Sequence, residues 1–225
     1  MKKVIKDKRR EAYNRIREFI LTYKIKPGQR LDHEYLRKEI GVSTTPIREA
    51  LNRLMEEGFI FQIKNRGYFV SDLSIGELED LYEVREALEV FAATKTLKEG
   101  LEITEAFRTE LEQTMDLYYK YAHEEPYRNR LMLDQEFHVD LAKLANNSLL
   151  STKLENIFEK VNYKRKVVEL HPQRGQEASE EHYKILNLFL EGNKRRLIER
   201  LQGHIRKGKE GIVGVLRARE ENMRL

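Results

Sequence analysis

The chain has 225 residues, of which 40% are hydrophobic and 36% are charged, a balance typical of soluble and mainly helical proteins. It contains no cysteine, which excludes disulfide bonds, thiolate metal sites and cysteine nucleophiles. No apolar run approaches the roughly 20 residues that a membrane helix needs, and the basic N-terminus lacks the apolar segment of a secretory signal. We therefore expect a cytoplasmic protein that does not enter a membrane.

The charge is unevenly distributed along the chain. Residues 1–75 hold 17 Lys or Arg against 10 Asp or Glu, a net charge of +7. The remaining residues hold 25 basic side chains against 28 acidic ones, a net charge of −3. A basic N-terminal third on a mildly acidic body indicates that the first part binds a polyanion.

The first third of the chain predicts three helices followed by a β-hairpin. Glycine or proline follows each of the first two apolar periodic segments, and Gly41 is placed as a helix C-cap. Threonine followed by proline is a typical helix start, because threonine caps well and proline suits the first turn. The helices are expected near 7–23, at 32–40 and from Thr45-Pro46, and the strands at 59–63 and 68–70.

Two short helices joined by Gly41-Val42-Ser43 and followed by a hairpin predict a winged helix-turn-helix. In that motif the N-terminal residues of the second helix contact base edges in the major groove of DNA, and the hairpin tip can enter the minor groove. The alternative is a helical subdomain whose charges only face water. The residues predicted to contact DNA are Ser43, Thr44, Thr45, Arg48, Asn52, Arg53, Arg66 and Gly67.

The segment from Ile25 to Ser74 resembles the N-terminal domain of the GntR family of bacterial regulators. The resemblance includes the Pro27-Gly28 turn, the sequence GVSTTPIREAL, the Glu-Gly-Phe-Ile entry to the hairpin and the Asn-Arg-Gly wing tip. The family usually has arginine after the serine of the GVS motif, where this chain has Thr44. The resemblance implies binding to double-stranded DNA, with a base contact at Thr44 that differs from the usual one.

Beyond residue 75 the helical period continues through six segments with short breaks between them. Short connections favour antiparallel neighbours in a bundle. The sequence therefore predicts a mainly α protein in which a winged helix-turn-helix (1–73) precedes an antiparallel six-helix bundle (74–225). The six segments are expected at about 75–99, 103–123, 126–145, 148–170, 177–191 and 194–221.

Four polar residues fall on the apolar faces of the last helices: Asp134, His138, His182 and His204. Asp134 and His138 are four residues apart and so project from one helix face. A single core histidine is usually bonded to the backbone, but buried ionisable groups must be paired or coordinated. One carboxylate and three imidazoles form a suitable ligand set for a divalent ion. We expect zinc first, with nickel or manganese as alternatives.

Two arginines also lie in apolar stripes. Arg85 is predicted to bind the carboxylate of an effector, with an ion pair to Glu89 one turn on as the equal alternative. Arg165 is predicted to line the same pocket, with a position at the bundle edge as its alternative.

The segments ELEDLYEVREALEVFAA, LDQEFHVDLAKLANNSLL and EEHYKILNLFLEGNKRRLIERLQGHI resemble the C-terminal FCD domain of the FadR subfamily. Six helices in about 150 residues resemble its shorter VanR-type branch. Many members of that branch hold a divalent metal through an Asp-x-x-x-His pair and two later histidines. The resemblance implies these roles for Asp134, His138, His182 and His204.

These observations favour a transcriptional regulator, which we expect to be a repressor and not an enzyme. It would bind a short palindromic operator as a homodimer and respond to a small carboxylate bound at the metal. A metal-dependent hydrolase with an appended basic domain is an alternative, although Glu136, the nearest candidate base, points away from the ligand face. A regulator with a purely structural metal is another.

Overall fold

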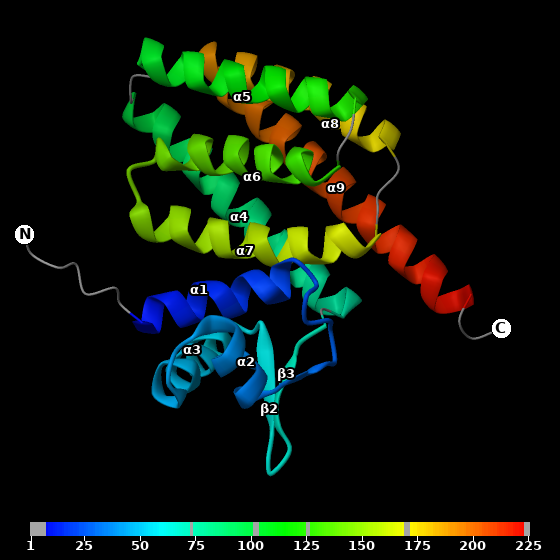
Figure 1. Cartoon of the computed structure of the whole chain (residues 1–225). Coiled ribbons are helices and arrows are strands. Elements are labelled where there is room, and N and C mark those ends of the chain that lie inside the picture. Colours follow the sequence, from blue (N-terminus) through cyan, green and yellow to red (C-terminus); the bar gives the residue numbers. More distant parts are fainter. Residues whose placement is uncertain (1–7, 73, 101–103, 125–126, 169–171, 223–225) are drawn as a thin grey trace, which may run out of the picture. The chain divides into compact units, whose positions relative to one another are not determined.

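The computed structural model describes residues 8–72, 74–100, 104–124, 127–168 and 172–222. The chain divides into two compact units, Met1–Leu73 and Ser74–Leu225 (Figure 1). The helix ends predicted at 103, 126 and 170 lie outside the described residues. No helix in the described ranges is long and apolar enough to span a membrane.

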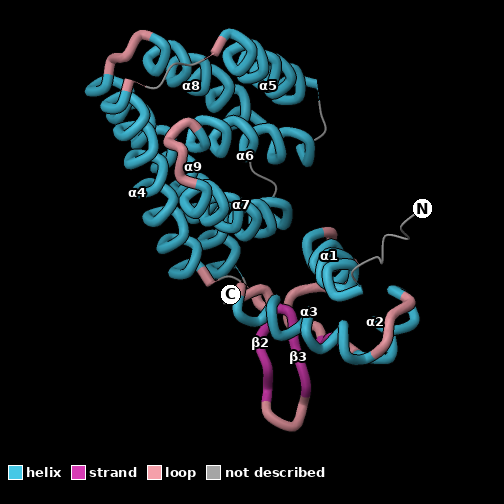
Figure 2. Tube along the Cα trace, turned by 90° about the vertical axis from the view of Figure 1, so that its left-hand side faces the viewer, coloured by secondary structure: helices cyan, strands magenta, loops and turns pink. Residues whose placement is uncertain are grey.

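The first unit is a winged helix-turn-helix, as predicted. Its three-stranded sheet is antiparallel with the order β1-β3-β2, and the β2–β3 hairpin projects from the three helices (Figure 2). Helix α1 packs chiefly against α3, and both contribute fully buried isoleucine and leucine side chains to the core. The elements are α1 (Lys8–Leu21), β1 (Arg30–Leu31), α2 (His33–Ile40), α3 (Thr44–Glu56), β2 (Ile60–Ile63) and β3 (Gly67–Val70).

Local capping fixes the position of the two helices at the turn. The Asp32 side chain accepts a hydrogen bond from the Tyr35 backbone at 2.8 Å, and Gly41 ends α2 in the left-handed conformation with φ 76°. Helix α3 begins at Thr44, with Ser43 as its N-cap, one residue before the predicted start. Pro46 is tolerated there because the amide groups of the first helical turn have no partner inside the helix.

The second unit consists, within the described residues, of six helices with short connections, and the prediction of a mainly α fold is confirmed. Helix α4 packs chiefly against α9, while α5 contacts α6 and α8. Helices α5, α6 and α7 follow one another as stacked rods in Figure 1. The elements are α4 (Ile75–Glu99), α5 (Glu105–Glu124), α6 (Tyr127–Lys143), α7 (Ser148–Val168), α8 (Pro172–Leu190) and α9 (Lys194–Asn222).

Helix α8 begins at Pro172, five residues before its predicted start at 177. The prediction was wrong because Gly175 was taken as part of a break. Proline suits the first helical position, and at Gly175 the helix lies close to the Arg130 side chain. A Cβ atom at Gly175 would lie 2.0 Å from Nη1 of Arg130, whose side chain fills that space.

Candidate metal centre and nucleic-acid interface

The four polar residues predicted from the helical stripes come together inside the second unit. Helix α6 supplies Asp134 and His138, α8 supplies His182 and α9 supplies His204. One ligand atom from each residue lies within 4.8 Å of the others. All four residues are buried, with exposed fractions between 1% and 5%. Three helices far apart in sequence therefore bring one carboxylate and three imidazoles to a single point.

The three imidazole rings direct their Nε2 atoms toward one another. Nε2 of His204 lies 3.0 Å from Nε2 of His138 and 3.3 Å from Nε2 of His182. Oδ1 of Asp134 lies 3.4 Å from Nε2 of His182. Nitrogen ligands bound to one zinc ion at about 2.1 Å lie about 3.4 Å apart in a tetrahedral site, close to the spacing of these atoms.

Two buried carboxylates determine which nitrogen carries the proton. Nδ1 of His138 donates to Glu89 at 2.6 Å, and Nδ1 of His204 donates to Glu181 at 2.8 Å. With their Nδ1 protons directed at carboxylates, the Nε2 atoms of both rings are the positions left for a shared ligand, and they face each other at 3.0 Å. Burial holds the pKa of His204 well below its ordinary value, so a second proton is disfavoured. A cation between the nitrogens relieves this arrangement.

The carboxylates of Glu89 and Glu181 are themselves bound by positively charged side chains. Nε of Arg85 donates to Glu89 at 2.5 Å, while Arg174 and Lys207 donate to Glu181 at 2.8 and 2.9 Å. Burial alone would raise the pKa of Glu89, but Arg85 and His138 beside it bring that pKa down to about 2. Such supporting hydrogen bonds orient metal-binding histidines and increase their basicity.

Arg165 lies beside the ligand set. Its Nη1 donates to Oδ2 of Asp134 at 2.7 Å. Burial would raise the pKa of Asp134, and Arg165 opposes that effect so that the pKa lies well below its usual value. Asp134 thus stays ionised, as a metal ligand must.

Arg85 forms the ion pair with Glu89 that was one of the two alternatives for it, and its binding of an effector stays a prediction. Its Nε pairs with Glu89, and its guanidinium lies 4.1 Å from the centre of the Phe158 ring. Its Nη2 is buried and forms no hydrogen bond with the described residues, and the same is true of Nδ1 of His182. Two donors near the centre are therefore open to an acceptor group.

Free space beside the centre is small. A cavity of about 10 Å³ lies against Glu89 and His138, with a wall formed by apolar side chains of α6, α8 and α9. That volume holds about one water molecule. A larger ligand at this position requires the helices to separate.

The supporting groups Glu89, Glu181 and Arg174 were not assigned to the metal from the sequence. Glu89 was considered only as the partner of Arg85, and Glu181 precedes His182 without sharing its helical face. Each reaches a histidine on another helix, at sequence separations of 49 residues for Glu89 and 23 for Glu181. No local pattern signals such a contact.

The predicted DNA contacts at the start of α3 are all exposed: Ser43, Thr44, Thr45 and Arg48. The Ser43 side chain forms no capping hydrogen bond and so remains available. Arg66 is exposed at the tip of the hairpin, beside Gly67 with its φ of 102°. The left-handed backbone at Gly67 favours glycine and produces the tight turn.

Two other predicted DNA contacts have partners within the unit. The Asn52 side chain accepts a hydrogen bond from the Tyr68 hydroxyl at 3.0 Å, which joins α3 to β3. The Arg53 guanidinium lies 3.9 Å from the centre of the Tyr13 ring and donates to Glu57 at 3.0 Å. Arg53 therefore links α3 to α1, a role that the sequence did not indicate.

Arg30 on β1 was not predicted to contact DNA. It is exposed, and its Nε lies 3.3 Å from the place where a Cβ of Gly67 would be. A second guanidinium therefore lies at the base of the hairpin turn.

Both units match known protein families. Residues 8–70 match the family described as bacterial regulatory proteins, gntR family, and residues 80–207 match the FCD domain. The second match alone covers more than half of the chain.

Relatives of similar length carry the names of regulators. The chain is 28% identical to the Nta operon transcriptional regulator of Aminobacter aminovorans, over 88% of this chain and 90% of that protein. It is 26% identical to the uncharacterized HTH-type transcriptional regulator YdhC of Bacillus subtilis, over 94% of each. The solved structure of McbR/YncC of E. coli superposes with a TM-score of 0.78 at 17% identity, covering 92% of this chain and 97% of that one. That likeness shows the fold alone.

Proposed function

Because the chain belongs to the gntR family of bacterial regulatory proteins and carries an FCD domain, we propose that it represses transcription in response to a small carboxylate. The first unit binds a short palindromic operator in the cytoplasm, and the second unit binds the effector. The observation that carries the effector proposal is the buried cluster of Asp134, His138, His182 and His204.

One divalent ion occupies this cluster in the proposal. Zinc is the first candidate, with nickel and manganese as alternatives, because nitrogen and oxygen ligands suit all three. Support comes from the facing Nε2 atoms of His138 and His204 at 3.0 Å, whose Nδ1 atoms are already occupied by carboxylates. The bound ion would supply positive charge and open positions to an anion.

The effector carboxylate would lie at the open side of the ion, and Arg85 is its second anchor. The buried Nη2 of Arg85 has no hydrogen-bond partner among the described residues, which is a costly state that an acceptor relieves. Arg165 acts in the same region by pairing with Asp134 at 2.7 Å. Both arginines thus contribute charge that favours an anion.

Binding of the effector is expected to change helix packing. The cavity beside Glu89 and His138 has only about 10 Å³, so a carboxylate larger than a water molecule fits only when α6, α8 and α9 move apart. An effector that binds the open arrangement better than the closed one shifts the population toward it. Such a shift can alter DNA affinity if the two arrangements place the DNA-binding units differently.

A homodimer follows from the palindromic operator, because two copies of the winged helix read two half-sites. Helix α4 offers a surface for this contact. Val84 and Phe91 are 50% and 54% exposed, and with exposed Ala87 they form one apolar stripe on α4. We place the dimer contact on this stripe.

We infer no catalytic role for the metal. Glu136, the carboxylate considered as a base, is not part of the cluster of four ligand residues. A regulator with a purely structural metal is the remaining alternative, and an effector response that depends on the metal separates the two.

The test combines metal analysis with a thermal-shift measurement on the full-length protein. We expect one divalent ion per chain after incubation with zinc, nickel or manganese, and a higher melting temperature when acetate is added to the loaded protein. His138→Ala should lower the metal content and remove the effect of the carboxylate, while operator binding persists. Absence of bound metal, or a normal carboxylate response in His138→Ala, would contradict the proposal.

A further inference from the structure

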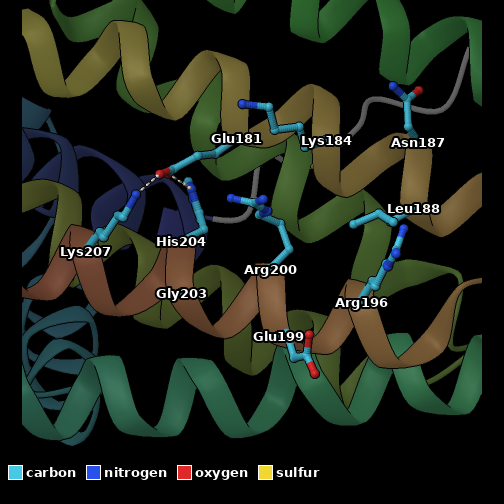
Figure 3. Close-up of a pocket in the computed structure, with 10 residues that line it drawn as sticks. All are labelled: Glu181, Lys184, Asn187, Leu188, Arg196, Glu199, Arg200, Gly203, His204 and Lys207. Atoms are coloured by element: carbon cyan, nitrogen blue, oxygen red, sulfur yellow. Dashed lines mark hydrogen bonds and ion pairs between the residues drawn. The ribbon is translucent and has the colours of Figure 1, made fainter.

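A basic groove lies between α8 and α9, and Glu181 and the metal-ligand residue His204 are among the residues that line it. It has a volume of about 550 Å³, which is within the range of small-molecule sites. At one end of the groove, Glu181 accepts from both His204 and Lys207 (Figure 3). The groove therefore differs in position and in size from the small cavity beside Glu89.

Four cations line the groove: Lys184, Arg196, Arg200 and Lys207. Figure 3 shows Arg196 and Arg200 rising from α9 toward α8. The lining also contains two carboxylates, Glu181 and Glu199, against the four cations. Nζ of Lys207 donates to Oε1 of Glu181 at 2.9 Å, and Nζ of Lys184 lies 3.6 Å from Oε2 of Glu180. The lining thus keeps an excess of positive charge after these pairs are formed.

Arg196 and Arg200 are the cations of the groove that are free to bind a ligand. No hydrogen bond or ion pair joins the guanidinium of Arg196 or Arg200 to another residue in the part of the chain that the structure describes. They are four residues apart on α9, so their side chains lie on one face, about 5–6 Å apart at Cβ. Two guanidinium forks at this spacing can bind two acidic groups, or two edges of one phosphate.

Gly203 keeps the middle of the groove open. It lies inside α9, where glycine destabilises a helix by roughly 0.5–1 kcal/mol relative to alanine. A Cβ at this position would meet no atom within 4 Å, so close packing does not require the glycine. A larger side chain at Gly203 would extend into the groove without displacing the backbone.

We propose that the groove between α8 and α9 is a second ligand site, which binds a small oxyanion with at least two negative charges. A phosphate monoester and a dicarboxylate share this chemistry. Arg196 and Arg200 bind the acidic groups, Lys184 adds charge from α8, and Gly203 leaves room for the body of the ligand. The site does not use the metal.

Calorimetric titration of the full-length protein with inorganic phosphate, and separately with succinate, in about 0.15 M salt tests the proposal, because weak surface attraction is screened under these conditions. Binding of phosphate alone identifies the phosphate class, and binding of succinate in a His138→Ala background identifies the dicarboxylate class. We expect Arg196→Gln/Arg200→Gln to weaken binding about tenfold or more, the loss expected for charge-assisted hydrogen bonds. The matched control is Arg195→Gln, an exposed arginine of the same helix outside the groove lining, and it should bind normally.

Gly203→Met provides a test that preserves the charges. Methionine is a good helix former, so α9 stays folded while the side chain fills the groove, and binding should be lost. Failure of both anions to bind, or unchanged binding in the double arginine variant or in Gly203→Met, overturns the proposal. Anion binding that disappears in His138→Ala but survives in the arginine variant places the ligand at the metal centre, which would refute the groove site and leave the proposed function intact.

Discussion

At the scale of single residues, the metal site depends on carboxylates that bind its histidines and are not ligands themselves. Glu89 accepts a hydrogen bond from Nδ1 of His138 at 2.6 Å and one from Nε of Arg85 at 2.5 Å. Glu89 therefore fixes the orientation of His138, and Arg85 fixes the orientation of Glu89. Removing the charge of Glu89 weakens both contacts and leaves a buried guanidinium without its partner.

We predict that Glu89→Gln lowers the metal affinity about 10- to 100-fold, the usual loss when a supporting hydrogen bond to a histidine ligand is altered. Competition with a chromophoric chelator measures the affinity, and circular dichroism checks the fold. Glu86→Gln is the control, because Glu86 lies on the same helix and pairs at the surface with Arg206. Equal affinities of wild type and Glu89→Gln would show that Glu89 does not position the ligand.

We also predict that Arg48→Ala reduces operator affinity by roughly 1–3 kcal/mol if Arg48 contacts a base, and that Arg66→Ala reduces it further. Both side chains are exposed at the surfaces that a winged helix presents to DNA. Fluorescence anisotropy at several salt concentrations gives the affinity, which should fall steeply with salt. Lys120→Ala, a surface cation of the second unit, is the control, and normal binding by the double arginine variant would rule out these contacts.

At the scale of elements, α4 begins with a reciprocal capping arrangement directly after the first unit. The Ser74 hydroxyl accepts from the Glu77 backbone at 3.2 Å, and the Glu77 carboxylate accepts from the Ser74 backbone at 2.9 Å. The same helix carries Arg85 and Glu89, so its start determines where these two side chains enter the bundle.

We predict that Ser74→Ala lowers the free energy of unfolding by about 0.5–2 kcal/mol, the usual cost of losing an N-cap. The Ser74 backbone and then its hydroxyl lower the pKa of Glu77 below 4.5, so the folded state favours the ionised carboxylate. This contribution to stability is present above pH 4.5 and is lost as the pH falls through the lowered pKa.

Urea denaturation at pH 7 and near pH 4 should therefore show a smaller acid-induced loss of stability in Glu77→Gln than in wild type. Glu79→Gln, whose carboxylate pairs with Arg217 and makes no cap, should retain the acid response that comes from the cap. Identical pH profiles for wild type and Glu77→Gln would exclude a role of this carboxylate.

At the scale of the whole molecule, the proposed function requires assembly of two chains into a dimer. The apolar stripe of Val84, Ala87 and Phe91 on α4 is exposed in the single chain, and burying it in a contact between two copies removes apolar surface from water. A charge in the centre of such a contact is costly because it loses its hydration.

We predict that Phe91→Lys shifts the protein from dimer to monomer and weakens binding to a palindromic operator, with little effect on binding to a single half-site. Sedimentation equilibrium at micromolar concentration measures the first effect. Met132→Lys is the control, since Met132 is 68% exposed on α6, away from the stripe. A wild-type monomer in the presence and absence of DNA would contradict the homodimer, and a dimeric Phe91→Lys would move the contact elsewhere.

The fold class could be predicted from the sequence because helical periodicity, caps and turn residues are local signals. The winged helix and the six-helix bundle were predicted correctly from them, and the family was predicted correctly from the resemblance of its motifs. The burial of Asp134, His138, His182 and His204 was also readable, because their spacing from apolar neighbours places them on core faces.

Only the tertiary structure decided which groups meet. Glu89 reaches His138, Glu181 reaches His204, and Arg165 reaches Asp134, in each case from another helix. The Arg130 side chain fills the space beside Gly175, and the Arg53 guanidinium lies over the Tyr13 ring. A periodic pattern specifies the face of a helix that is buried, but the partner on that face depends on how helices cross, and this is set by the packing of the whole core.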